Sequence, residues 1–322
     1  MDMTNVIHGI AHLGHVTIDQ CARLWYRGAA TADSRRQLGM RMLLDIHKQG
    51  FTLRSPRKVI SSGVYSFGGL VYMLSSEGWS YVQQMMSTNV AHWYGALVSA
   101  PQSRTVNPSM HSVLLTEVLT SMACGIDACA SDARIACRRE PLLGYEKEGR
   151  RLRADALIGI LLDDSVRESS LPPSFQAQRT VWRPVNWMIW EQYDQESHAR
   201  MHGLYVLELD LGYKPMTLFE RRALACAAGR EIPPKFFTVA SWSPTPIIVT
   251  SSPQRANSIA HAWHASDPSS SVYVTTLRHA IDNPMDGEGW IAFLGGRHEA
   301  RPLSPFAWLA NRCEPQALER SS

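Results

Sequence analysis

Charged residues interrupt two apolar segments in the second half of the chain. Glu208 and Asp210 alternate with leucines in residues 205–211, and Asp155 lies near the beginning of the apolar residues 153–162. Side chains of a β-strand alternate between its two faces, so Glu208 and Asp210 would share one face. Burying a carboxylate costs free energy unless the group is paired or bound to a metal ion. The three acids therefore predict a site at which carboxylates meet a cation.

A restriction-endonuclease-like domain would bring these acids together. That fold uses an acid on a helix, an Asp that opens one strand and a Glu-x-Lys on the next strand. Its acids hold a Mg²⁺ that activates water for phosphodiester cleavage. Glu117, in a segment of helical periodicity, would be the helix acid, and Asp155 and Glu208 would hold the metal. The expected cofactor is therefore Mg²⁺, provided that the domain is active.

The lysine of this pattern is missing from its expected position. Asp210 stands where the Glu-x-Lys pattern has its lysine. Lys214 lies just beyond it, and Arg153 lies two residues before Asp155, on the same face of the expected strand. Either Lys214 or Arg153 would have to supply the positive charge. The alternative is a domain that has lost cleavage and has kept a fold that binds DNA.

The segments around the acids alternate between strand and helix patterns. Apolar or alternating runs predict strands, and apolar residues spaced three and four apart predict helices. The expected strands are residues 133–138, 153–162, 205–211, 246–250 and 271–275, and the expected helices are residues 109–122, 216–228 and 254–265. Residues 163–184 are polar and rich in proline, which predicts an inserted loop. This order predicts an α/β (α+β) domain with a mixed sheet.

The first part of the chain has the pattern of a winged helix-turn-helix. Residues 17–25 predict one helix and residues 34–49 a second, each with a Ser or Thr that can cap it. Residues 51–53 and 70–74 predict two strands, joined by a basic hairpin that is rich in turn residues. Two short helices with a tight connection match the plan in which the second helix enters the major groove of DNA.

Basic residues concentrate on the two elements with which a winged helix contacts DNA. Between residues 1 and 58, Lys and Arg outnumber Asp and Glu, although the whole chain carries a net charge of only +3. Such residues would contact phosphates, and the beginning of the helix would contact base edges. The expected DNA-binding residues are Arg35, Arg36, Arg41 and Lys48 on the helix and Arg54, Arg57 and Lys58 on the hairpin. The alternative is a winged helix that contacts other proteins, with its arginines solvated.

Composition and length predict a two-domain protein of the cytoplasm. The chain has 322 residues, 45% of them hydrophobic and 19% charged. No run approaches the ~18 apolar residues of a membrane span, and the first residues lack the basic start of a signal peptide. Six cysteines are scattered without a Cys-x-x-Cys pair, which favours reduced thiols over a zinc knuckle. We expect a winged-helix domain over residues 1–88, a connector over 89–108 and the α/β domain over 109–322.

The order of these features resembles the replication-relaxation family of plasmid and mobile-element proteins. The matching segments are residues 16–24, the helix with Arg35 and Arg36, and residues 70–78, 153–156 and 207–212. The resemblance implies a winged helix joined to a restriction-endonuclease-like domain, and a relation to conjugative relaxases that nick DNA at a transfer origin. An acid at the position of Asp210 is similar to the family's own pattern. Leu211, Tyr213 and the Pro-rich insertion depart from that pattern.

These features predict a duplex-DNA-binding protein of a mobile element. It would act in plasmid replication, relaxation or conjugative transfer, and it would nick DNA with Mg²⁺ if the second domain is active. Double-stranded DNA is the expected partner; a homodimer and replication or transfer proteins are further candidates, and no membrane partner is expected. Two alternatives remain open, a transcriptional regulator without an enzymatic step and an assembly protein with an inactive nuclease-like domain.

Overall fold

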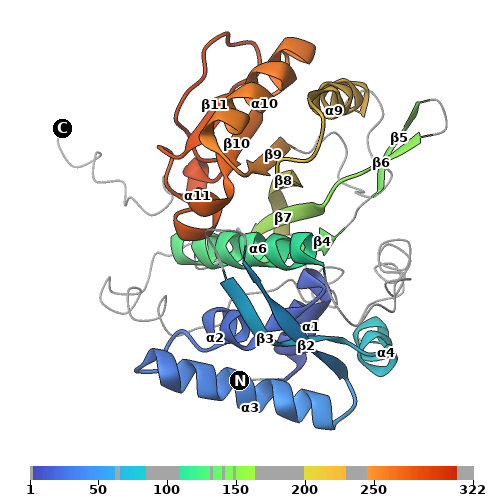
Figure 1. The fold of residues 1–322 in the computed structure, drawn as a ribbon, viewed down its shortest axis with the longest axis vertical. Helices are drawn as coiled ribbons and strands as arrows, with labels where there is room; N and C mark the ends of the chain where they lie inside the picture. The colour runs from blue at the N-terminus through green and yellow to red at the C-terminus, as the bar shows by residue number, and fades with distance from the viewer. Residues whose placement is uncertain are drawn as a thin grey trace.

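The computed structural model describes residues 3–61, 66–84, 109–130, 133–139, 142–147, 150–163, 199–229 and 245–309. The expected connector, residues 89–108, and all of the expected insertion beyond Asp163 lie outside the described residues. Within the described residues the chain is a mixture of helices and sheets (Figure 1). The α/β class predicted from the sequence is therefore confirmed.

A small antiparallel sheet and several helices form the first part of the chain. Its elements are α1 (Met3–Leu13), β1 (Val16–Thr17), α2 (Ile18–Trp25), α3 (Ala32–Lys48), β2 (Thr52–Ser61), β3 (Ser66–Leu74) and α4 (Ser76–Gln84). The strand order is β1-β3-β2. Thr17 caps α2, and its side chain accepts a hydrogen bond from the N–H of Gln20 while the Gln20 side chain accepts one from the N–H of Thr17. Thr31 caps α3, and its side chain accepts a hydrogen bond from the N–H of Ser34.

Three features of this part differ from the sequence-based expectation. The helix α1 was not predicted, and the hairpin strands β2 and β3 extend well beyond the two short strands expected. The spacing of Leu38, Met42, Leu43 and Ile46 predicts one apolar stripe on α3; Leu43 and Ile46 are buried, but Leu38 is exposed and Gly39 is buried. A Cβ at position 39 would lie 3.1 Å from the backbone nitrogen of Ala22. The absence of a side chain therefore lets α3 cross α2 at close range.

The second part of the chain contains a six-stranded mixed sheet. Its elements are α6 (Met110–Cys129), β4 (Arg134–Arg139), β5 (Leu142–Lys147), β6 (Arg150–Arg153), β7 (Ala156–Asp163), β8 (Ala199–Asp210), α9 (Met216–Gly229), β9 (Thr245–Thr250), α10 (Pro253–Ser266), β10 (Val272–Thr276), α11 (Leu277–Asp282) and β11 (Trp290–Phe293). The strand order is β11-β10-β9-β8-β7-β4, and β5 and β6 form a separate hairpin. Strands β8, β9 and β10 are parallel, and the other neighbours are antiparallel.

Helices cover both faces of the large sheet. Leu207 and Leu209 of β8 pack in one core with α6, whereas Ile248 of β9 packs in a second core with α9 and α10. The two leucines alternate along β8 with Glu208 and Asp210, whose side chains contact α9 and α10. The prediction that these two acids share one face is therefore confirmed. They project to the side of the sheet opposite α6.

The helix α6 is central to the molecule. Among the described helices, α6 is long and apolar enough to span a membrane, which the sequence analysis did not expect of any segment. In the structure, 72% of this apolar stretch is buried inside the protein. Its apolar residues face both the large sheet and the first part of the chain (Figure 1). Its composition is thus that of a core helix packed on two sides.

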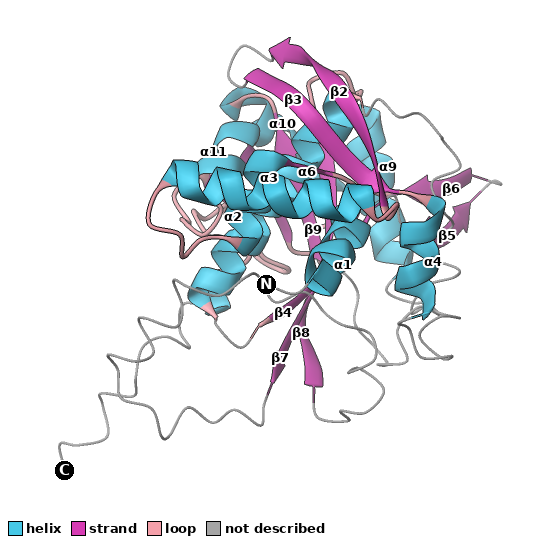
Figure 2. Cartoon of the chain, turned by 90° about the horizontal axis from the view of Figure 1, so that it is seen from below, coloured by secondary structure: helices cyan, strands magenta, loops and turns pink. Residues whose placement is uncertain are grey.

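The described portions of the two expected domains share one hydrophobic core. Residues of α1 and α2 and residues of α6, β4 and β8 belong to the same buried cluster. Polar contacts join the same elements: Arg139 of β4 donates hydrogen bonds to the Leu13 carbonyl at 3.2 Å and to Ser112 Oγ at 2.8 Å. Seen from below, α3 lies on the near side of the molecule with the β2–β3 hairpin beside it (Figure 2). The two parts therefore pack against each other through α6, and α3 lies on the outer surface.

Candidate active site and nucleic-acid interface

Lys214 lies between two of the predicted acids. Its Nζ is 3.0 Å from Asp155 Oδ2 and 3.1 Å from Glu208 Oε2. Asp155 lies between β6 and β7, Glu208 lies in the neighbouring strand β8, and Lys214 lies in the loop that follows β8. The sequence left Lys214 and Arg153 as candidates for the missing lysine. The structure brings Lys214 to the acids, and the side chain of Arg153 lies outside what the structure describes.

Asp155 accepts hydrogen bonds from three directions. Besides Lys214, its Oδ2 accepts the backbone N–H of Leu209 at 2.7 Å, and His111 Nε2 lies 3.4 Å away. Burial would by itself raise the pKa of the Asp155 carboxyl. The His111 hydrogen bond, the positive charge of Lys214 and the N–H of Leu209 together hold that pKa well below its ordinary value. The group is therefore a carboxylate over the whole physiological pH range.

His111 is a residue of this cluster that sequence reasoning missed. It lies in the first turn of α6, and its Nε2 is also 3.2 Å from the Leu209 carbonyl oxygen. A carbonyl oxygen only accepts, so we assign the ring proton to Nε2. The sequence shows that His111 stands at the beginning of an expected helix. The apolar periodicity of that helix does not indicate that this end lies beside Asp155.

Glu208 is almost completely buried and has two cationic partners. Its side chain is 3% exposed, and Arg222 of α9 forms an ion pair with it from the side opposite α6. A buried carboxylate is tolerated when its charge is compensated. The ion pairs with Lys214 and Arg222 therefore explain why an acid stands in an apolar strand.

Asp210 does not join the cluster of Asp155, Glu208 and Lys214. Its fully buried carboxylate accepts hydrogen bonds from Arg255 Nε of α10 at 2.8 Å and from Thr250 Oγ1 of β9 at 3.1 Å. It also accepts the backbone N–H groups of Gly212 and Lys214. Four donors occupy its lone pairs. Asp210 therefore fixes the loop that carries Lys214 and has little capacity left for a metal ion.

Glu117, the predicted helix acid, does not lie beside Asp155 and Glu208. Its carboxylate accepts a hydrogen bond from Gln20 Nε2 at 2.8 Å and forms an ion pair with Arg23, both on α2. It is separated from His111 by nearly two turns of α6, and it faces the first part of the chain. The structure thus brings Asp155 and Glu208 together but leaves Glu117 in the seam between α2 and α6.

Asp155 and Glu208 form a donor pair that suits Mg²⁺. One oxygen of each carboxylate lies within about 3 Å of the same ammonium nitrogen, so the two acids converge on one point. Magnesium is commonly held by one or two carboxylates, with water and substrate phosphates as its other ligands. The described residues contain no group of three or more His, Cys, Asp or Glu with metal-site geometry. The point between the two carboxylates holds the Lys214 ammonium, so a metal ion bound by both acids would take its place.

The outer face of α3 is basic. Arg41 is exposed. Arg36 and Lys48 are largely exposed, although Arg36 pairs with Asp19 at 3.0 Å and Lys48 lies 4.0 Å from Asp45. On the hairpin, Arg54 is exposed, whereas the side chains of Arg57 and Lys58 lie outside what the structure describes. The apolar side chain of Met40 is also exposed on α3. This part of α3 therefore presents charged and apolar groups to solvent.

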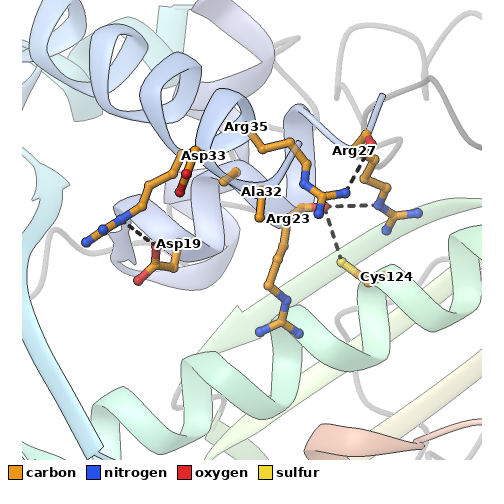
Figure 3. Close-up of a pocket in the computed structure, with 9 residues that line it drawn as sticks. Asp19, Arg23, Arg27, Ala32, Asp33, Arg35 and Cys124 are labelled. Atoms are coloured by element: carbon orange, nitrogen blue, oxygen red, sulfur yellow. Dashed lines mark hydrogen bonds and ion pairs between the residues drawn. The ribbon is translucent and has the colours of Figure 1, made fainter. Parts of the chain in front are cut away.

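Arg35 and two arginines of the α2 region point away from that face. They line a pocket of about 440 Å³ between α2, the first turn of α3 and α6 (Figure 3). Arg23 and Arg27 form ion pairs with Glu117 and Asp127 of α6, so their charges do not contribute to the outer face of α3. The residues that line the pocket are Asp19, Ala22, Arg23, Arg27, Ala32, Asp33, Arg35, Arg36 and Cys124.

Comparison of the chain with protein-family models, with curated proteins and with solved structures finds no match. The function is therefore argued from the geometry of these sites.

Proposed function

We propose that the chain binds duplex DNA through α3 and the β2–β3 hairpin and that its carboxylate–lysine cluster cleaves a phosphodiester bond. By carboxylate–lysine cluster we mean Asp155, Glu208 and Lys214. The position of Lys214 Nζ, 3.0 and 3.1 Å from the two carboxylates, is the observation on which the cleavage proposal depends. The sequence lacks Glu-x-Lys, and in the proposed site Lys214 would supply the positive charge from the loop after β8.

The arrangement of the first part supports DNA binding. Two helices joined by a short turn and followed by a β-hairpin are the elements of a winged helix-turn-helix. The helix α3 presents its basic face outward, and Arg54 continues that charge onto the hairpin. Lys and Arg side chains of this kind neutralise phosphates and release counterions. The resemblance to the replication-relaxation family adds the expected setting, which is plasmid replication, relaxation or transfer.

The residues of the cluster have distinct roles in the proposed cleavage. Mg²⁺ held by Asp155 and Glu208 would activate water and neutralise charge on the phosphate. In the structure the Lys214 ammonium lies between the two carboxylates. It would move aside for the metal ion and donate hydrogen bonds to phosphate oxygens, whose negative charge grows as the bond breaks. Asp155 stays ionised because its pKa is lowered, so it is available as a ligand at neutral pH. Arg222 compensates the charge of Glu208 from α9.

The first test is a nicking assay on supercoiled plasmid that carries DNA from around the protein's own gene. The wild type is compared with Asp155→Asn and with Glu299→Gln, which removes an exposed acid far from the cluster in sequence. Nicking that requires Mg²⁺ or Mn²⁺, survives in Glu299→Gln and disappears in Asp155→Asn supports the proposal. Calorimetric titration with Mg²⁺ provides a readout that does not depend on activity, and Asp155→Asn should weaken that binding.

Other outcomes contradict separate parts of the proposal. Specific DNA binding without nicking, with the same affinity in Asp155→Asn, would contradict the cleavage step and leave the DNA-binding step intact. Absence of DNA binding at low salt would contradict the DNA-binding step and favour an assembly protein.

A specific observation favours a second candidate, a DNA-binding regulator without an enzymatic step. Each acid on this edge of the sheet already has a cationic side chain as a partner: Lys214 for Asp155, Arg222 for Glu208 and Arg255 for Asp210. Such a network holds the loop and the flanking helices together without a metal ion. The same nicking assay distinguishes the two candidates.

A further inference from the structure

The arginine-lined pocket between α2, α3 and α6 shares Arg36 with the outer face of α3 and is otherwise not used by the proposed DNA-binding face or by the carboxylate–lysine cluster. Four arginines, Arg23, Arg27, Arg35 and Arg36, line this space of about 440 Å³. Figure 3 shows Arg35 extending from α3 toward Arg27, away from the outer face of the helix. Charges of the same sign repel one another, so such a cluster needs acceptors to stabilise it.

Three of the four guanidinium groups have a carboxylate partner, and these partners lie on different elements. Glu117 pairs with Arg23, Asp127 with Arg27, and Asp19 with Arg36. Within the described part of the chain, Arg35 has no carboxylate partner. Among the described residues, the guanidinium of Arg35 makes one long hydrogen bond, 3.4 Å from Nη1 to the carbonyl of Arg27. Arg35 therefore brings an uncompensated positive charge and free N–H donors into the pocket.

Arg27 is committed to other partners. It uses Nη1 for Asp127 and Nε for the Arg23 carbonyl, and its Nη2 is buried from solvent. An oxygen-rich anion in the pocket would therefore be held by Arg35, whose charge no carboxylate among the described residues compensates.

The remaining lining limits the size and shape of that anion. A volume of about 440 Å³ is that of a small-molecule site rather than of a single bare ion. Ala22, Ala32 and Cys124 supply apolar wall for an organic group. Asp33 stands at the same opening, where it would repel an extended polyanion and accept hydrogen bonds from hydroxyl or amino groups. A phosphate on a small polar body complements all of these groups.

We propose that this pocket binds a phosphate-bearing small molecule of nucleotide size, with its phosphate on Arg35. Arginine is the side chain best suited to such a contact, because its planar fork donates two parallel hydrogen bonds to phosphate oxygens. The pocket is walled by α2 and α3 on one side and by α6 on the other. A bound molecule would therefore join the first part of the chain to the helix that carries His111.

Calorimetric titration of the full chain tests the proposal with three probes, AMP, adenosine and inorganic phosphate, at constant ionic strength. We expect AMP to bind, inorganic phosphate to bind more weakly and to compete with AMP, and adenosine not to bind. Binding of AMP and adenosine with equal affinity would overturn the proposal, because the phosphate would then contribute nothing. Failure of both AMP and phosphate to bind would overturn it as well.

Two substitutions on the same helix provide a matched pair. Arg35→Gln removes the unpaired guanidinium and should raise the Kd for AMP by about tenfold or more, as expected for loss of hydrogen bonds from a charged group. Arg41→Gln removes an arginine from the outer face of α3 and should leave that Kd unchanged. Thermal unfolding of both unliganded variants checks that they fold. Equal weakening by the two substitutions, or an effect of Arg35→Gln on DNA affinity without any AMP binding by the wild type, would overturn the proposal.

Discussion

Arg255 holds Asp210 by an ion pair, with 2.8 Å between Nε and Oδ2, at the point where β8 ends. The same guanidinium donates from Nη2 to the carbonyl oxygen of Lys214. Asp210 in turn accepts the backbone N–H of Lys214. The ion pair of Asp210 and Arg255 therefore holds both the N–H and the C=O of Lys214 in the loop after β8. This pair places the lysine of the carboxylate–lysine cluster, although neither of its members touches the cluster's acids.

Replacement of Asp210 should therefore release the loop. Asp210→Asn keeps the shape of the side chain but leaves Arg255 without its counter-charge in a largely buried position. Breaking a buried pair by removal of one partner costs about 3–5 kcal/mol. We expect a loss near the lower end, because the Arg255 side chain is 22% exposed. Urea unfolding measures the change in the free energy of unfolding.

The chain offers a matched control for that measurement. Arg278 and Asp282 form an ion pair across one turn of α11, and both side chains are well exposed. Exposed pairs contribute about 0.2–1 kcal/mol, so Asp282→Asn should change the unfolding free energy far less than Asp210→Asn. Equal effects would mean that the buried pair does not hold the loop.

The pH dependence of stability should report the pairing of Asp155. Its pKa is lower in the folded chain than in the unfolded chain, against the direction in which burial acts, because of His111, Lys214 and the N–H of Leu209. A depressed pKa contributes stability that is present above the unfolded value of about 3.9 and is lost as the pH falls through the folded value. Lys214→Met raises the folded pKa and should move the acid unfolding midpoint to higher pH.

Circular dichroism between pH 2 and pH 7 follows that transition. Lys48→Met is the control, because Lys48 is exposed at the end of α3 and lies 4.0 Å from Asp45. We expect its acid midpoint to stay with that of the wild type. A midpoint for Lys214→Met that does not move would show that Lys214 does not contact Asp155 in solution.

The positions of most elements around the acids could be predicted from the sequence. The strand expected at residues 246–250 is β9, Thr245–Thr250, and the helix expected at 254–265 is α10, Pro253–Ser266. Short-range patterns of apolar residues determine such segments, so periodicity finds them. The alternation of side chains along a strand predicts that Glu208 and Asp210 share one face of β8. Their contacts with α9 and α10 confirm this prediction.

The partners of the acids could not be predicted in this way. His111, Arg222 and Arg255 reach Asp155, Glu208 and Asp210 from helices that are distant from them in sequence or lie on another layer. Packing of the layers decides these contacts, and no local pattern encodes them. For the same reason Glu117 was assigned to the nuclease-like site, because the docking of α2 against α6 is invisible to a periodicity argument.

DNA affinity should depend on Arg41. Arg41 is exposed on α3 and lies outside the arginine-lined pocket. If it contacts one phosphate, Arg41→Gln should reduce the slope of log affinity against log salt concentration by about 0.9 and weaken binding to all sequences alike. Fluorescence anisotropy with a labelled duplex at several salt concentrations measures the slope. Arg297→Gln, an exposed arginine of the C-terminal part, should leave it unchanged. An identical slope in Arg41→Gln and in the wild type would remove α3 from the DNA interface.

Glu117 can be assigned to the seam or to the active site by one substitution. Its carboxylate accepts from Gln20 at 2.8 Å and pairs with Arg23. Glu117→Ala leaves two donors of α2 without their acceptor, which should lower the free energy of unfolding by about 1–3 kcal/mol. Addition of Arg23→Ala should then cost less than Arg23→Ala alone, because the two residues are coupled. Nicking by the folded fraction should remain close to that of the wild type. If Glu117→Ala instead abolished nicking without changing the free energy of unfolding, Glu117 would be the helix acid of the metal site.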